Sequence, residues 1–201
     1  MHVVDDALSA EVVIGAAVLA AGGVAMGLSR LTLERIPTAG VLSACFFVAS
    51  LIHVPLGPSS VHLILNGLAG LALGWAAFPA LLVGLLLQAV FFGFGGVTAL
   101  GVNVLAIAGP AVIVGMALRG PVARATPRGA AVLGGIAGAG SIALTAIFVA
   151  GALALTGDAF LPAAQLVLAA HVPVMVVEGL VTAAAVHLAR KVKPELFAAL
   201  A

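Results

Sequence analysis

The sequence contains very few charged residues. Only 7% of its 201 residues are Asp, Glu, Lys or Arg, whereas 64% are hydrophobic and the mean hydropathy is +1.33. A soluble domain carries roughly a quarter charged residues because its surface faces water. This scarcity excludes a soluble globule, and the net charge of +1 provides no field that would attract nucleic acid. We therefore predict an all-α integral membrane protein embedded in the lipid bilayer.

Three further features are missing. The single cysteine, Cys45, cannot form an internal disulfide. No Lys or Arg precedes Arg30, so the N-terminus lacks the basic start of a secretory signal peptide, and we expect the mature chain to begin at or near Met1. No G-x-x-x-x-G-K-[ST] loop occurs in the sequence, so a process driven by ATP would need a partner protein.

Charged residues and clusters of proline or glycine divide the chain into seven hydrophobic segments. A transmembrane helix needs about 20 mostly apolar residues. We predict a single transmembrane domain over 1–201, with an N-terminal strap at 1–10 and spans near 11–29, 38–54, 60–74, 79–96, 98–118, 129–155 and 163–189. The segment Pro55-Leu56-Gly57-Pro58 cannot continue a helix. Six spans are the alternative, if 60–74 is re-entrant.

The lysines and arginines provide a test of this division. They follow the first, fifth and seventh predicted spans: Arg30, Arg35, Arg119, Arg124, Arg128, Arg190, Lys191 and Lys193. With seven spans they all lie on one side of the membrane, and Lys and Arg mark the cytoplasmic side. The sequence therefore predicts an outer N-terminus and a cytoplasmic C-terminus.

Three histidines, His2, His53 and His62, lie near the predicted outer face. Each could simply cap a helix end, but imidazole is also the commonest nitrogen ligand of transition metals. The Met1 amine, the His2 amide nitrogen and the His2 Nδ1 can form adjoining chelate rings. One further histidine would complete a planar set of four nitrogens, which suits Ni(II) or Cu(II) and is compatible with Co(II). His62 is the candidate for this donor, and His53 is a possible alternate or entry ligand.

Four blocks of the sequence occur in the order found in a known family. The first is the start of the chain, where Met1-His2, an acidic Asp5 and Leu8-Ser9 resemble the opening MHIPDGFLS. The others are GPSSVHL at 57–63, GGVTALGVN at 95–103 and AHVP at 170–173 with Glu178-Gly179. Together they resemble the CbiM/NikM family, the substrate-capture components of energy-coupling-factor cobalt and nickel transporters.

This resemblance implies a multi-pass protein of a bacterial or archaeal cytoplasmic membrane that binds Ni²⁺ or Co²⁺ as its transported substrate. It implies Met1, His2 and His62 as metal ligands and no catalytic residue. The implied partners are a transmembrane coupling subunit, cytoplasmic ATPase subunits and, as a further candidate, a small accessory membrane subunit. One departure is that Val4-Asp5-Asp6 lacks the family's glycine at its third position, which would tolerate a positive φ. The path of the strap is therefore open at this stage.

Two ionisable residues, His171 and Glu178, fall inside the last predicted span. Such groups are costly in a membrane and indicate function by default. They lie close to one helical face, and two interpretations are open. They could support the metal site as a second shell together with Asn103, or they could form structural hydrogen bonds to a polar partner such as Asn103, Asn66 or Gln88.

Two other function classes compete with metal capture. A membrane-embedded enzyme could use His171 and Glu178 as acid–base groups, but the spans contain no complete ligand cluster or evident nucleophile. A proton-coupled carrier could use the same pair, but the chain has too few buried acids for a proton relay. The sequence therefore favours metal capture.

Overall fold

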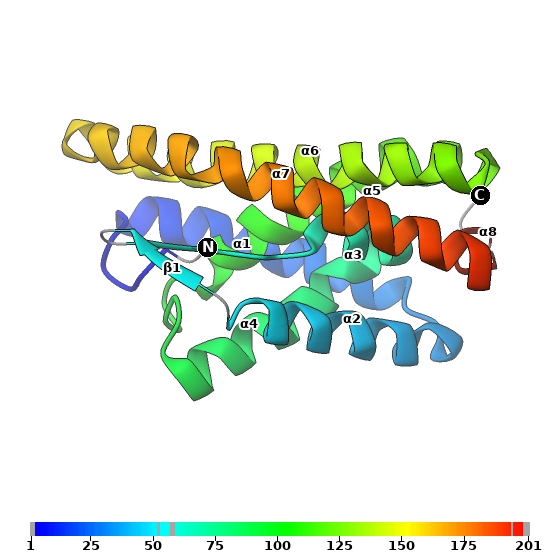
Figure 1. Cartoon of the computed structure of the whole chain (residues 1–201). Helices are drawn as coiled ribbons and strands as arrows, with labels where there is room; N and C mark the ends of the chain where they lie inside the picture. Colours follow the sequence, from blue (N-terminus) through cyan, green and yellow to red (C-terminus); the bar gives the residue numbers. More distant parts are fainter. Residues whose placement is uncertain (1–2, 52, 57–58, 194, 199–201) are drawn as a thin grey trace.

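The computed structural model describes residues 3–51, 53–56, 59–193 and 195–198. In this part of the chain the main helices are α1 Ala10–Ser29, α2 Ile36–Ala49, α3 Asn66–Leu73, α4 Ala77–Phe92, α5 Leu100–Arg124, α6 Pro127–Thr156 and α7 Leu161–Val192. The shorter elements are η1 Leu33–Arg35, β1 His53–Leu56, β2 Ser59–His62, η2 Gly74–Ala76, η3 Asp158–Phe160 and α8 Glu195–Ala198. Figure 1 shows the long helices lying side by side as a bundle. The predicted all-α membrane fold is confirmed.

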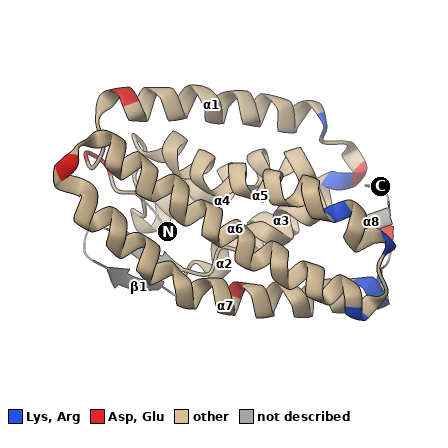
Figure 2. Ribbon diagram, turned by 90° about the horizontal axis from the view of Figure 1, so that it is seen from above, with Lys and Arg blue, Asp and Glu red and all other residues tan. Residues whose placement is uncertain are grey.

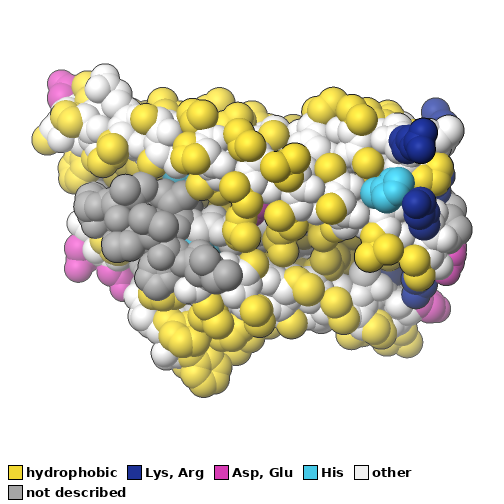
Figure 3. Space-filling model, viewed as in Figure 1, with side chains coloured by type: hydrophobic (Ala, Val, Ile, Leu, Met, Phe, Trp, Pro, Cys, Tyr) yellow, Lys and Arg dark blue, Asp and Glu magenta, His cyan; other side chains and the backbone are white. Residues whose placement is uncertain are grey.

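Several helical stretches of the described chain are long and apolar enough to cross a bilayer. They are Ala10–Ser29, Asn66–Phe92, Leu100–Arg124, Pro127–Thr156 and Asp158–Val192. Their outward side chains are apolar as well, and hydrophobic groups cover most of the face shown in Figure 3. A surface of this kind is stable against lipid, whereas in water it would lead to association. The chain is therefore a multi-pass membrane protein.

The stretch Asn66–Phe92 is a helical hairpin and not one continuous span. Its backbone turns at Gly74, where φ is 57°, and η2 carries the chain from α3 into α4. On one side of this turn Gly70 packs α3 against α5, and on the other side Gly84 packs α4 against α2. The predicted third and fourth spans therefore correspond to two separate arms of the bundle.

The predicted helical span over 60–74 differs from the structure in its first half. Helix begins only at Asn66, because β2 pairs antiparallel with β1 and the chain continues extended after it. The preceding helix α2 also ends early, at Ala49. Pro55 and Pro58 supply no backbone N–H for a helix, and the hairpin pairs the surrounding peptide groups in another way. Unpaired peptide groups would be costly in a membrane.

Small residues allow the helices to approach closely. A Cβ placed on Gly138 of α6 would lie 2.6 Å from the carbonyl oxygen of Glu178 on α7. A Cβ on Gly67 of α3 would lie 2.6 Å from the carbonyl oxygen of Ala137. Both distances are below van der Waals contact, so a larger residue would push the helices apart. Helix association in lipid depends on this type of packing.

The two ends of the bundle differ in charge, as Figure 2 shows. The lysines and arginines gather at the end where α1 and α5 finish and where α7 closes the bundle, which we call the basic end. There the Arg30 guanidinium lies 5.9 Å from the centre of the Trp75 ring. At the opposite end, which we call the acidic end, lie Glu11 and Asp158. The predicted gathering of basic residues is therefore observed, and the cytoplasmic location of that end stays a prediction.

Candidate metal-binding site

The described part of the N-terminal strap, residues 3–9, is bound to the start of α5. Val3 is buried, and its backbone N–H donates to Asn103 Oδ1 over 2.8 Å. The Asn103 side-chain amide in turn donates to the Val3 carbonyl oxygen over 3.0 Å. One buried amide thus satisfies both backbone groups of Val3, as a neighbouring strand would do. Asn103 therefore fixes the residue that directly follows Met1 and His2.

Asp5 provides the second attachment of the strap. Its Oδ1 accepts hydrogen bonds from the Thr98 hydroxyl and from the Ala99 backbone N–H, the latter over 3.0 Å. These hydrogen bonds hold the pKa of the Asp5 carboxyl below its usual value. Gly96, with φ of 85°, lies so close to this carboxyl that a Cβ would overlap it. The glycine-rich block at 95–103 therefore serves as the receptor for the strap.

The turn of the strap keeps its shape although the family's glycine is absent. Asp6 adopts a φ of 63°, in the left-handed region that glycine would occupy without strain. Aspartate is one of the few other residues that visit this region regularly. The departure at Val4-Asp5-Asp6 therefore does not prevent the left-handed turn.

His62 lies at the end of the β hairpin, at the acidic end of the bundle. Its side chain is buried, and its ring lies 6.5 Å from the Phe46 ring in an edge-on arrangement. Its Nδ1 lies 2.8 Å from the Leu63 carbonyl oxygen. In the hairpin register, His62 is the direct backbone partner of His53. The hairpin therefore brings together the two positions that the sequence proposed as loop ligands.

Glu178 holds the segment that connects His62 to α3, residues 63–65, which we call the loop segment. Its Oε1 accepts hydrogen bonds from the backbone N–H groups of Ile64 and Leu65, the second over 2.9 Å. The Glu178 side chain is fully buried on α7. Of the two interpretations that the sequence left open, a hydrogen bond to Asn103, Asn66 or Gln88 is not observed for Glu178 in the described part of the chain. The partner is the backbone of the loop segment.

The amides proposed as its partners are used elsewhere. Asn66 donates to the Ile107 carbonyl oxygen over 3.1 Å and to the Thr145 hydroxyl over 3.0 Å. Gln88 donates to the Ser50 hydroxyl over 2.6 Å. Each amide ties two or three helices together in the bundle core.

His171 is also buried on α7, and its Nδ1 contacts the Val167 carbonyl oxygen one turn earlier in the same helix. Within the described residues its Nε2 has no hydrogen-bond partner. A second-shell role for His171 stays a prediction, as does a ligand role for His53.

The strap and the first residue of α3 are both bonded to α5, one helical turn apart. Val3 is bonded to Asn103, and Asn66 is bonded to the carbonyl of Ile107, four residues further along the helix. Four residues correspond to one turn and about 6 Å of helix. The N-terminal residues and the chain that follows His62 are therefore held at neighbouring positions of the same helix.

Two of the three predicted ligands, Met1 and His2, lie outside the described residues. In the described part of the chain no three His, Cys, Asp or Glu side chains are grouped closely enough to hold a metal ion. The known part of the candidate site is thus His62 and the framework that holds it and the strap.

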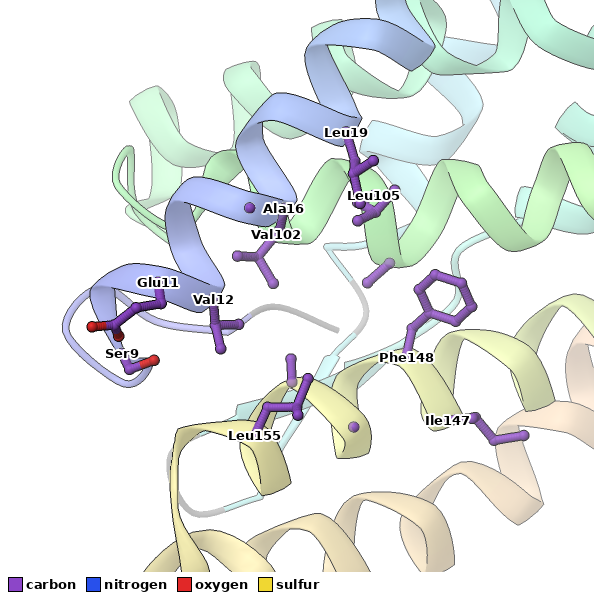
Figure 4. A pocket seen from close by; sticks show the side chains of 14 residues that line it. Ser9, Glu11, Val12, Ala16, Leu19, Val102, Leu105, Ile147, Phe148 and Leu155 are labelled. Atoms are coloured by element: carbon purple, nitrogen blue, oxygen red, sulfur yellow. The ribbon is translucent and has the colours of Figure 1, made fainter.

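An apolar groove of about 700 Å³ opens between α1, α5 and α6, as Figure 4 shows. Ser9 and Glu11 stand at one end of it, and Leu19, Leu105 and Phe148 line the other. Its lining among the described residues contains no histidine or cysteine. The groove therefore offers no nitrogen or sulfur ligands to a transition metal.

Comparison with known proteins identifies the family. Residues 2–196 match the family model CbiM, described as the cobalt uptake substrate-specific transmembrane region. This chain belongs to the CbiM family. The suspected resemblance is confirmed, and it covers nearly the whole chain.

Relatives of this CbiM-family chain have names that refer to metal transport. A metal transport protein of Haemophilus influenzae is 42% identical, and the match covers 98% of this chain and 96% of the relative. The fused nickel transport protein NikMN of Rhodobacter capsulatus is 42% identical over 39% of this chain, which corresponds to 24% of that relative. The family is one of transporters and not of enzymes, so an enzymatic use of His171 and Glu178 receives no support.

Two solved structures share the fold of this CbiM-family chain. A transition metal transporter aligns with a TM-score of 0.77 at 23% identity, over 96% of this chain and 93% of the other. A truncated transition metal transporter aligns with a TM-score of 0.73, also at 23% identity, over 95% of this chain and 97% of the other. At this identity the comparison shows the fold alone. The chain is a substrate-specific membrane component of the cobalt and nickel uptake family.

Proposed function

We propose that this protein captures Ni²⁺ or Co²⁺ for an energy-coupling-factor importer. The metal is bound by the Met1 amine, by the amide nitrogen and imidazole of His2, and by the imidazole of His62. The observation that supports this most strongly is the buried, two-way hydrogen bonding of Val3 to Asn103. A chelate built from residues 1 and 2 needs the next residue to be fixed, and Val3 is fixed.

The two halves of the proposed site are held by separate contacts. The strap is attached through Val3 and Asp5 to the start of α5, and His62 is fixed by the hairpin and the loop segment. Such preorganisation lowers the entropy that metal binding must overcome. The donor set of four nitrogens suits a divalent ion late in the first transition series.

The charge distribution supports one orientation of the protein in the membrane. The acidic end, with strap and hairpin, would face the outside and receive the ion, whereas the basic end would face the cytoplasm. The sequence carries no phosphate-binding loop for ATP. ATP hydrolysis therefore belongs to cytoplasmic ATPase subunits, which act through a transmembrane coupling subunit, and a small accessory membrane subunit is a further candidate partner.

The test of this proposal is Ni²⁺ content per purified protein for three versions of the chain. They are the native start, a chain with two Gly residues added before Met1, and His2→Ala. A single added residue would make the histidine third in the chain, where the amine, two peptide nitrogens and the imidazole can bind Ni²⁺ by themselves. The two added residues remove no side chain but turn the Met1 amine into a peptide nitrogen, so they should reduce Ni²⁺ content about as strongly as His2→Ala. Normal Ni²⁺ content in the extended chain would refute the amino-terminal chelate.

A further inference from the structure

We infer that Glu178 is the positioning residue of the metal site, and that it presents His62 to the metal through Nε2. This inference rests on the proposed function, in which His62 is a ligand. It concerns how a buried carboxylate on α7 sets the direction of an imidazole on another element. The connection between them is a single peptide group.

That peptide group joins Leu63 to Ile64. Its N–H donates to Glu178 Oε1, and its carbonyl oxygen lies 2.8 Å from His62 Nδ1. A peptide group is planar and trans, so its N–H and C=O point in opposite directions. When Glu178 fixes the direction of the N–H, it also fixes where the carbonyl oxygen lies. The His62 ring is thereby held from the far side of the peptide.

The protonation of the ring follows from the same contact. A carbonyl oxygen can only accept, so His62 Nδ1 must carry the hydrogen in this hydrogen bond. In a neutral imidazole the other nitrogen, Nε2, then holds the lone pair that can bind a metal. Metal-binding histidines are commonly fixed in this way by a carbonyl or carboxylate on their second nitrogen. Here the carboxylate acts through the intervening peptide.

The loop segment depends on Glu178 for its shape. Ile64 and Leu65 lie between the end of β2 and the start of α3, and Leu65 has a φ of 56°. Their N–H groups are therefore paired by neither element, and both donate to Glu178 Oε1 beside the N-terminus of α3. Without Glu178 the buried N–H of Ile64 and the partly buried N–H of Leu65 would lose their acceptor, and the segment would have to rearrange. Glu178 thus links the position of His62 to α7.

The first measurement is the tautomer of His62 in the metal-free protein, by ¹⁵N NMR of labelled histidine, with the His62 signal assigned from His62→Ala. The native chain should show hydrogen on Nδ1. Glu178→Leu should lose this preference, and Thr182→Val, a matched change one turn along α7 at another buried residue, should keep it. Hydrogen on Nε2 in the native chain would overturn the inference, and so would an unchanged tautomer in Glu178→Leu.

The second measurement is Ni²⁺ affinity together with the visible circular dichroism of the Ni²⁺ complex. Glu178→Leu should weaken Ni²⁺ binding by about 10–100-fold and change the spectrum, whereas Thr182→Val should change neither. Should Glu178→Leu fail to fold, Glu178→Gln keeps an acceptor oxygen without the charge and should weaken binding by about tenfold. Native affinity and spectrum in a folded Glu178 variant would show a purely structural role.

The experiments distinguish failure of the positioning role from failure of the proposed function. The tautomer is read without metal, so it tests the positioning role even if His62 proves not to be a ligand. Unchanged Ni²⁺ affinity in His62→Ala would contradict the proposed ligand set, whereas a native His62 tautomer in Glu178→Leu would contradict only the positioning role.

Discussion

The acidic and basic ends of the bundle differ in how the backbone that connects the helices is hydrogen-bonded. At the basic end the connections are short, and α6 starts with Pro127 and a Thr126 side chain that accepts from the Gly129 N–H over 3.2 Å. At the acidic end the backbone is irregular, and the strap receives its hydrogen bonds from the side chain of Asn103 and from Thr98 and Ala99. Irregular backbone near a membrane requires such dedicated partners. The proposed function assigns metal binding to the acidic end, with its irregular backbone, and closure of the bundle to the basic end.

The largest expected effect is all-or-none labelling of introduced cysteines, which shows which end of the bundle faces outward. In a Cys45→Ser background, cysteines at exposed Thr32 of the basic end and exposed Asp158 of the acidic end should react with an impermeant reagent from opposite sides of the membrane. In cells only the cysteine at Asp158 should be labelled, and in inverted vesicles only the one at Thr32. Reaction of both from the same side would break the comparison of the two ends.

The next largest effect is a difference in Ni²⁺ affinity between two histidine variants, one at each end of the bundle. His62→Ala at the acidic end should weaken Ni²⁺ binding by more than about 100-fold, because losing a ligand costs more than losing an outer-shell partner. His187→Ala should leave binding unchanged, since His187 is a half-buried residue whose Nδ1 contacts the Pro127 carbonyl oxygen at the basic end. Isothermal titration with Ni²⁺ would measure both. Full affinity in His62→Ala would direct the search for the missing donor to His53.

A smaller difference in Ni²⁺ affinity is expected between variants of two polar residues, Asn103 at the acidic end and Thr126 at the basic end. Asn103→Leu leaves both backbone groups of Val3 without partners, at about 1–3 kcal/mol for each buried group. We expect Ni²⁺ affinity to fall by about 10–100-fold, as for other groups that orient a ligand. Thr126→Ala removes a helix cap at the basic end and should cost about 1 kcal/mol of stability with no change in Ni²⁺ affinity. Thermal unfolding and Ni²⁺ titration of both variants measure this, and equal Ni²⁺ affinities would remove the proposed distinction.

The smallest effect concerns pH and the Asp5 anchor. Hydrogen bonds lower the pKa of Asp5 in the folded chain, so its stabilising contribution is present above its unfolded value of 3.8 and is lost only as the pH falls further. Ni²⁺ release between pH 7 and pH 5, the range around the usual imidazole pKa of about 6.5, should therefore follow protonation of the ligand nitrogens and not of Asp5.

Asp5→Asn tests this assignment. It should weaken Ni²⁺ binding only a few-fold, because an amide oxygen can still accept from Ala99, and by the same factor at pH 7 and at pH 5. A factor that differs between the two pH values, measured by titration with Ni²⁺, would show that the strap anchor titrates together with the ligands.

The sequence alone determined the long helices and the family. It placed spans at 11–29, 129–155 and 163–189, where the structure has α1 Ala10–Ser29, α6 Pro127–Thr156 and α7 Leu161–Val192. Long apolar runs bounded by charges or prolines allow only one solution in a membrane, the helix. The four sequence blocks identified the family because they occur in the family's order along nearly the whole chain.

Only the tertiary structure decided the hairpin and the contacts of the site. A short apolar segment such as 60–74 does not distinguish strand from helix by its pattern, and here pairing with β1 determined the outcome. The partner of Glu178 could not be found among sequence motifs, because it is the backbone N–H of Ile64 and Leu65, and every residue except proline carries such a group. Which peptide reaches a buried carboxylate depends on how α3 and α7 pack, and that packing exists only in the folded chain.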